Sequence, residues 1–323
     1  MFLSVILFAI GLVLLIYGGD WFVDGATGIA KRFRLPDIVV GATVVSIGTT
    51  LPEVMVSTTG ALQGSGAMAY GNAIGSIICN TALIAAISIT CNPGPVNVQS
   101  MKTPAIFFYL AAAIYCLAAY GMGTFPRWLG FIMLAVFAVY MFLTVRNGLR
   151  NPDAAAEEAE EAKEKALWQE LLLLVGGAAI IAVGADLLVE HGQIIALGLG
   201  VPETVVALLF VALGTSLPEL VTTITSLRKG RASLGVGNVI GANVFNLVLV
   251  SGVAVSLAPF DVPVENTLLN TGLNLSLVFD IPVMLVVMSL MIFPALMNRK
   301  LSRWQGLTLL GIYAAFVVLQ FVL

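Results

Sequence analysis

Long apolar stretches alternate with short polar segments along the whole of this chain. Ten of the apolar stretches reach the ~20 residues that a helix needs to cross a bilayer at ~1.5 Å rise per residue. They lie at residues 3–29, 37–63, 68–92, 104–122, 126–146, 167–190, 203–227, 233–258, 276–296 and 304–322. A composition of 59% hydrophobic and 10% charged residues, with a mean hydropathy of +1.02, excludes a soluble globular core. The pattern predicts an all-α integral membrane protein with ten transmembrane helices.

The second half of the sequence repeats the first with a shift of 166 positions. The segment GTTLPE at Gly48–Glu53 returns as GTSLPE at Gly214–Glu219, and Asn80 is matched by Asn246 without a gap. Five predicted helices per half is an odd number, so the second half must enter the membrane from the opposite side. This predicts two inverted five-helix repeats related by a pseudo-two-fold axis in the membrane plane. We therefore divide the chain into a first repeat (1–150), an acidic linker (151–166) and a second repeat (167–323).

Basic residues are sorted between alternate loops of the predicted topology. Of the 15 lysines and arginines, only Arg127 falls in the opposite set of loops. The positive-inside rule then predicts that the linker is cytoplasmic and that both termini lie outside the cytoplasm. The first apolar stretch has neither a basic start nor an A-x-A cleavage site, so we expect a retained helix in the cytoplasmic membrane.

Both repeats place a proline within an apolar helix, directly before a glutamate. Pro52 and Pro218 cannot donate a backbone hydrogen bond, and each clashes with the carbonyl four residues earlier. Freed carbonyls at membrane depth are tolerated only where they line a cavity or bind a ligand. The broken helices and the carboxylates of Glu53 and Glu219 are therefore expected to form one site near the bilayer midplane.

No lysine or arginine within the predicted helices could neutralise Glu53 or Glu219. An unpaired carboxylate at the bilayer centre costs about 2.5–3.5 kcal/mol, so a proton or a bound cation must compensate. Two bidentate carboxylates and two freed carbonyls, near Thr49 and Thr215, supply about six oxygens. That number suits Ca²⁺ better than Mg²⁺, which usually keeps its waters. A soft metal would favour histidine or cysteine, and the only histidine, His191, lies near the end of its helix.

Neutral polar side chains extend this predicted site at helical spacing. The stripes around the two motifs are Ser46, Thr49, Thr50 and Glu53, then Ala212, Thr215, Ser216 and Glu219. The following helices carry Asn72, Ser76 and Asn80, then Asn238, Ala242 and Asn246. For Asn72 and Asn238, hydrogen bonding between packed glycine-rich helices is an equally good explanation. The remaining residues expected to be structural are the cysteines Cys79, Cys91 and Cys116 and the acids Asp20, Asp37, Asp186, Glu203 and Asp280.

The paired GT[TS]LPE motifs, with GNAIGSIICN and GNVIGANVFN downstream, resemble the cation/Ca²⁺ antiporter superfamily. The resemblance is closest to the prokaryotic Na⁺/Ca²⁺ exchangers and covers nearly the whole chain. It implies that Glu53 and Glu219 bind both Ca²⁺ and Na⁺, helped by the carbonyls of Thr49 and Thr215. It further implies a centre completed by Asn80 and Asn246, and flanking Na⁺ sites lined by Ser46, Thr50, Ser76, Ala212 and Ser216.

Several positions depart from the family pattern. Ile77 replaces the usual asparagine, and Ala242 replaces a serine, which removes one hydroxyl ligand. Asn246 stands where the K⁺-dependent branch has an acid. Gly75 and Gly241 stand where the proton-coupled branch has a glutamate, so the resemblance favours sodium over proton coupling.

These features together predict a secondary antiporter that exchanges Ca²⁺ for Na⁺ across the cytoplasmic membrane by alternating access. We expect it to work as a monomer in the lipid bilayer, with no resident cofactor and no nucleic-acid partner. An exchanger of H⁺ for Ca²⁺ or another divalent cation is the main alternative, and a cation channel is a weaker one. An enzyme is not expected, because the chain has no P-loop and His191 lies in no catalytic motif.

Overall fold

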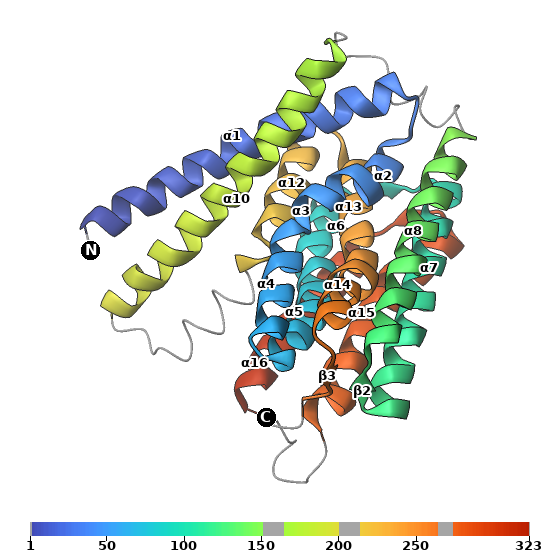
Figure 1. Cartoon of the computed structure of the whole chain (residues 1–323). Coiled ribbons are helices and arrows are strands. Elements are labelled where there is room, and N and C mark those ends of the chain that lie inside the picture. Colours follow the sequence, from blue (N-terminus) through green and yellow to red (C-terminus); the bar gives the residue numbers. More distant parts are fainter. Residues whose placement is uncertain (1, 151–164, 200–213, 264–273, 323) are drawn as a thin grey trace.

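The computed structural model describes residues 2–150, 165–199, 214–263 and 274–322, and these residues are almost entirely helical (Figure 1). The first half contains α1 (Phe2–Arg32), α2 (Asp37–Val40), α3 (Ser46–Thr49), α4 (Leu51–Leu62), α5 (Gly66–Cys79), α6 (Ala86–Cys91), α7 (Val98–Cys116) and α8 (Arg127–Leu149). The second half contains α10 (Leu167–Gly198), α12 (Leu217–Arg228), α13 (Ala232–Phe245), α14 (Ser251–Leu257), α15 (Ile281–Asn298) and α16 (Arg303–Val322).

Short π-helical segments join several of these helices into longer ones. They are η1 (Gly41–Val45), η2 (Asn80–Ala85), η3 (Leu117–Met122), η4 (Asn246–Val250) and η6 (Ser276–Asp280). Four two-residue strands form two antiparallel pairs that tie loops from the two halves together. In these pairs β1 (Gly94–Pro95) joins β4 (Lys300–Leu301), and β2 (Thr124–Phe125) joins β3 (Phe260–Asp261).

The described helices have the length and apolar character of membrane spans. Seven are long and apolar enough to cross a bilayer, and the bent pair 37–49 and 51–62 adds an eighth. Large apolar side chains such as Phe131 and Phe142 on α8 are more than half exposed, which suits contact with lipid rather than water. The predicted all-helical membrane fold is thus confirmed at this level.

The sequence repeat is also visible in the bounds of the helices. Shifting α4 by 166 positions gives the bounds of α12, and the same shift converts α5 into α13. The turns before α5 and α13 match as well, because Gly64 and Gly230 both adopt positive φ, at +83° and +71°. The π-helical segments begin at the matched residues Asn80 and Asn246.

Two long helices, α1 and α10, lie side by side and extend beyond the main bundle (Figure 1). Glycines at seven-residue spacing let their backbones approach closely. A Cβ on Gly11 would lie 2.9 Å from the Gly184 carbonyl oxygen, and one on Gly25 only 2.5 Å from the Leu174 amide. Small residues at such crossings are typical of membrane helix pairs.

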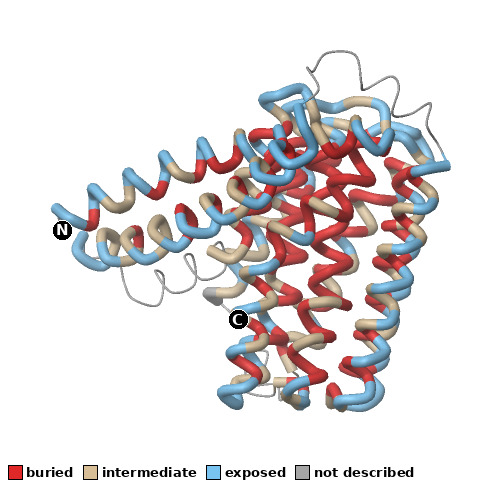
Figure 2. Tube along the Cα trace, turned by 45° about the horizontal axis from the view of Figure 1, so that its top comes forward, coloured by how far each residue is buried: buried red, intermediate tan, exposed pale blue. Residues whose placement is uncertain are grey.

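The core of the molecule surrounds α13, in which every residue from 234 to 245 is buried. Figure 2 shows buried residues concentrated in the central helices, with exposed ones along the outer part of α1 and α10. Gly237 and Gly241 let α13 pack closely on the first half, because a Cβ on Gly237 would clash with the Ile38 backbone and one on Gly241 with the Ala42 backbone. The two halves are therefore interleaved around the matched polar motifs.

Candidate cation site

The predicted helix breaks are present in the backbone. Thr50 (φ −85°, ψ −3°) leaves the regular helix, and the segment 37–49 is bent by 46° from α4, which begins at Leu51. Pro52 occupies the first turn of α4, where a missing amide hydrogen does no harm. Ser216 has nearly the same conformation (φ −90°, ψ 3°) before α12, which carries Pro218 in its first turn. The proline in each half thus starts a new helix with a glutamate at its N-terminal end.

Glu53 and Glu219 are completely buried, at 0% exposure. None of their four carboxylate oxygens accepts a hydrogen bond from the part of the chain that the structure describes, and none joins an ion pair found there. The two carboxylates lie within electrostatic range of one another. Thr49 and Thr50 lie against the Glu219 carboxylate, in contacts that fall short of hydrogen-bond geometry. The structure therefore brings the two predicted acids together from opposite halves.

Asn80 and Asn246 occupy matched positions beside the glutamates. Each begins a π-helical segment, and η2 packs on α12 while η4 packs on α4, so each segment lies against the glutamate helix of the other half. Both side chains are 0% exposed, and their oxygen and nitrogen atoms have no partner among the described residues. The buried hydroxyls of Thr50 and Ser216 have no partner there either. Such groups are rare in proteins, because an unpaired buried polar group costs about 1–3 kcal/mol.

The other expected ligands have different surroundings. Ser46 donates its hydroxyl to the carbonyl oxygen of Gly41 at 2.9 Å and lies 3.0 Å from that of Asn238, so it joins packed backbones. Ser76 is buried on α5, four residues before Asn80 and hence on the same face. Ala212 lies outside the described residues.

The hydroxyls of Thr49 and Thr215 are bound by the asparagines of the opposite half. Thr49 donates to Asn238 at 3.1 Å, and Thr215 donates to Asn72 at 3.2 Å. Of the two explanations for these asparagines, the structure favours hydrogen bonding between packed helices.

Cys79, which we expected only to pack, lies beside the buried glutamates. Its thiol lies 3.8 Å from the Tyr313 hydroxyl, faces Ser216, and is close enough to Glu53 and Glu219 to interact with their charges. The sequence did contain a hint of this position, because Cys79 lies three residues after Ser76 and hence on the same face of one helix.

The described residues contain no cluster of three histidine, cysteine or acidic side chains that could hold a metal. Two carboxylates with neutral oxygen donors suit a hard cation.

Two of the acids that we expected to be structural have the partners that such roles require. Asp37 begins α2 and pairs with Arg231 at 3.1 Å, and Asp280 accepts a hydrogen bond from Gln320 at 2.7 Å. Asp20 was expected near a helix end, which is wrong, because α1 continues to Arg32. The main-chain oxygen of Asp20 accepts a hydrogen bond from Lys229 instead. Glu203 lies outside the described residues.

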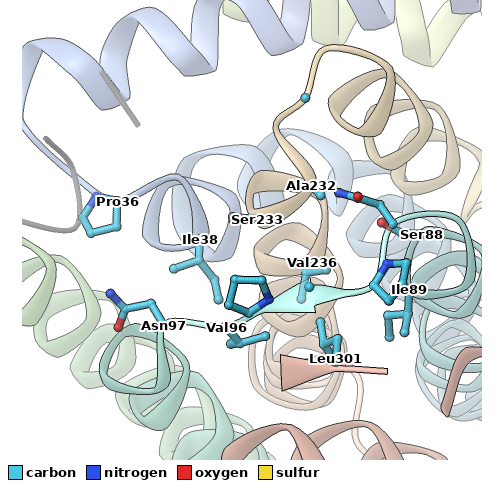
Figure 3. Close-up of a pocket in the computed structure, with 15 residues that line it drawn as sticks. Pro36, Ile38, Ser88, Ile89, Val96, Asn97, Ala232, Ser233, Val236 and Leu301 are labelled. Atoms are coloured by element: carbon cyan, nitrogen blue, oxygen red, sulfur yellow. The ribbon is translucent and has the colours of Figure 1, made fainter. Parts of the chain in front are cut away.

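A larger and a smaller cavity lie beside the central helices. The larger, of about 520 Å³, lies between the start of α2, the end of α6 and the start of α13, and Ser88, Asn97 and Ser233 are among its lining residues (Figure 3). None of the candidate ligands lines it. The smaller, of about 10 Å³, touches Thr49 and both motif prolines. Phe22 from α1 and Ile181 from α10 also line this cavity, so the long helix pair covers the broken helices.

The fold defines a polytopic membrane protein in which each of two matched halves contributes one fully buried glutamate. The family model for sodium/calcium exchanger protein matches residues 3–146 and 170–322, and the chain belongs to that family. The family is one of transporters rather than enzymes.

Similar proteins agree with this assignment along the whole chain. An uncharacterized membrane protein of Methanocaldococcus jannaschii is 34% identical over 95% of this chain and 94% of its own length. The sodium/calcium exchanger MaX1 of Methanosarcina acetivorans is 28% identical over 97% of each chain. The solved sodium-calcium exchanger NCX_Mj, soaked with Na⁺ and Sr²⁺, superimposes with a TM-score of 0.80 at 31% identity and 98% coverage of both chains.

Proposed function

We propose that this protein is a secondary antiporter that exchanges Na⁺ for Ca²⁺ across the membrane. The observation that carries the proposal is the pair of fully buried glutamates, Glu53 and Glu219, which no described cationic side chain neutralises. A buried carboxylate pair is stable only when a cation or protons compensate its charge. Membership of the sodium/calcium exchanger family supports Na⁺ and Ca²⁺ as those cations.

The two ions compete for the same oxygens in this proposal. Glu53 and Glu219 bind either one Ca²⁺ or Na⁺, because both ions are hard and take oxygen ligands. Asn80 and Asn246 supply neutral oxygens at the centre, and their unpartnered amide groups support this assignment. The remaining proposed ligands are the carbonyls of Thr49 and Thr215 and the positions Ser46, Thr50, Ser76, Ala212 and Ser216. A resident cofactor has no role in this scheme.

We propose that the chain crosses the cytoplasmic membrane ten times as two inverted five-helix repeats, residues 1–150 and 167–323. The acidic linker 151–166 is then cytoplasmic, and both termini lie outside the cytoplasm. The equal bounds of the matched helices and the sorting of basic residues support this topology. Because the proposed site draws all its ligands from one chain, a monomer suffices for transport.

Alternating access follows from the position of α1 and α10. These helices cover the broken helices through Phe22 and Ile181, which are 1% and 2% exposed. We propose that the pair slides along the bundle, so that the covered site opens to one side of the membrane at a time. An empty site would carry two uncompensated charges during this movement, so only the loaded states cross, and the two ion fluxes are coupled.

The direct test reconstitutes the purified protein into vesicles and follows ⁴⁵Ca²⁺ uptake. An outward Na⁺ gradient should drive uptake, and an imposed pH gradient without Na⁺ should not. Uptake driven by the pH gradient would identify a proton exchanger. A Ca²⁺ flux that needs no counter-ion gradient would identify a channel.

A further inference from the structure

Asn72 on α5 connects the two glutamate segments directly. Its side-chain oxygen accepts the hydroxyl of Thr215, which precedes Glu219 by four residues in the second half. Its side-chain nitrogen donates to Ser57 at 2.8 Å and to the main-chain oxygen of Glu53 at 3.3 Å, both on α4 in the first half. One amide therefore bridges the helix of one glutamate and the motif of the other.

Asn238 on α13 makes the reciprocal connection through one further side chain. Its oxygen accepts the hydroxyl of Thr49, which precedes Glu53 by four residues, and its nitrogen donates to Thr222 at 2.9 Å. The Thr222 hydroxyl in turn contacts the main-chain oxygens of Pro218 at 2.8 Å and Glu219 at 3.1 Å. Asn238 is 0% exposed, so water does not compete for these bonds.

We propose that Asn72 and Asn238 are positioning residues that lock the two half-sites into one rigid unit. Each uses both ends of its amide, and each joins a threonine of one half to a glutamate segment of the other. The inference rests on the proposed function, since it assigns these residues a role in holding the shared cation site. It goes beyond ligand assignment, because neither asparagine needs to touch the ion.

Physical chemistry explains why such a lock matters here. The glutamates start the new helices at a break, where backbone hydrogen bonds are interrupted and the local geometry is soft. A site binds its ion tightly only when supporting hydrogen bonds hold the ligands in place. In a buried setting, a network in which every group is paired is stronger than the same bonds in water. Losing one asparagine should thus loosen both half-sites together.

The experiment measures equilibrium binding of ⁴⁵Ca²⁺ to the purified full-length protein and its variants. Asn72→Ala and Asn238→Ala should each raise the dissociation constant for Ca²⁺ about tenfold. Thr49→Val should give the same weakening as Asn238→Ala, and the double variant should be no weaker than either single one, because all three remove one connection. Thr222→Ser keeps the hydroxyl that Asn238 binds and should bind Ca²⁺ like the wild type.

Asn243→Ala is the matched control for general destabilisation. Asn243 is also fully buried on α13, and it donates to Thr81 at 2.7 Å and to the Met288 sulfur at 3.1 Å, away from the glutamate segments. This variant should lose thermal stability while its Ca²⁺ affinity stays within about twofold of wild type.

Three results would overturn the positioning role. They are wild-type Ca²⁺ binding by Asn72→Ala and Asn238→Ala, equal weakening in Asn243→Ala, and multiplied effects in the Asn238→Ala/Thr49→Val double variant. Transport assays in vesicles distinguish a failure of the positioning role from a failure of the proposed exchange function. If the wild type fails to exchange Na⁺ for Ca²⁺, the proposed function is wrong, whatever the binding data on the asparagines.

Discussion

At the scale of single residues, the chemistry depends on which oxygen atoms lack partners. In the described part of the chain, the matched pairs Glu53 and Glu219, and Asn80 and Asn246, bury side-chain oxygens that no protein group satisfies. A fold does not keep such groups for stability, because burying them without partners costs free energy. Their pairwise repetition in the two halves indicates a shared ligand.

Replacing Asn246 by aspartate should strengthen Ca²⁺ binding. A third carboxylate beside Glu53 and Glu219 increases the negative charge that only a divalent ion can balance well, and we expect a gain of about tenfold, or about 1.4 kcal/mol. Competition between ⁴⁵Ca²⁺ and Na⁺ for the purified variant measures this. Asn246→Ala is the control and should weaken binding of both ions, whereas tighter Ca²⁺ binding by Asn246→Ala would contradict the assignment.

The sequence was sufficient to predict that Glu53 and Glu219 are buried beside helix breaks, and insufficient to predict the hydrogen bonds around them. Glu53 and Glu219 could be predicted because a carboxylate in an apolar helix is costly and occurs here twice at one spacing. The roles of Asn72 and Asn238 could not, since a polar residue on a glycine-rich helix can bind an ion or a neighbouring helix equally well. Cys79 was missed because its neighbours, Ser216 and Tyr313, are distant in sequence.

At the scale of elements, the site depends on a proline at the start of a helix. Pro52 and Pro218 lie in the first turns of α4 and α12, and the residues before these helices, Thr50 and Ser216, have ψ values near 0°, which depart from regular helix. Proline predicted this break reliably, because it removes a donor whatever the tertiary context. The π-helical turns at Asn80 and Asn246 were not predicted, since no local residue pattern distinguishes them from regular helix.

Substituting Pro52 by alanine should impair exchange without lowering stability. Alanine restores an amide donor, which can bind the Gly48 carbonyl and continue the helix through the break. We expect the rate of Na⁺-driven ⁴⁵Ca²⁺ uptake to fall at least tenfold, with an unchanged or higher melting temperature. Pro104→Ala, at a proline inside α7, is the control and should leave the rate unaffected. Full activity in Pro52→Ala would show that the break is not needed.

At the scale of the whole molecule, Lys229 connects the long helix pair to the bundle through ion pairs with two acids of α1. Lys229 is the residue directly after α12. Its ammonium lies 2.7 Å from the carboxylate of Asp24 and 3.5 Å from the carboxylate of Asp20, and both acids belong to α1. The connection spans more than 200 residues of sequence. The partners of Lys229 could therefore not be predicted from sequence alone.

Lys229→Gln should shift the position of α1 relative to α12. The ion pair forms only when α1 occupies its present position beside the end of α12. A partly exposed pair stabilises that position by about 0.2–1 kcal/mol. We expect up to about a fivefold change in the ratio of the two access states, measured by the distance between spin labels on α1 and α12. An unchanged distance distribution would exclude a role for this pair in transport.

The repeat supplies a reciprocal variant. Gln63 occupies the position that matches Lys229, and the exposed acids Asp186 and Glu190 on α10 match Asp20 and Asp24. Gln63→Lys should create the equivalent ion pair with Asp186 or Glu190. This new pair should favour the access state opposite to the one that the Lys229 ion pair favours. A shift in the same direction would contradict the proposed inverted relation of the halves.

We propose that one carboxylate from each half holds a single Ca²⁺ that Na⁺ displaces. Equilibrium binding of ⁴⁵Ca²⁺ to the purified wild type, Glu53→Gln and Glu219→Gln tests it most directly. We predict one Na⁺-displaceable Ca²⁺ per wild-type chain and a loss of affinity of at least a hundredfold in either variant. Two independent Ca²⁺ ions per chain, with each substitution removing only one, would show that the glutamates belong to separate sites.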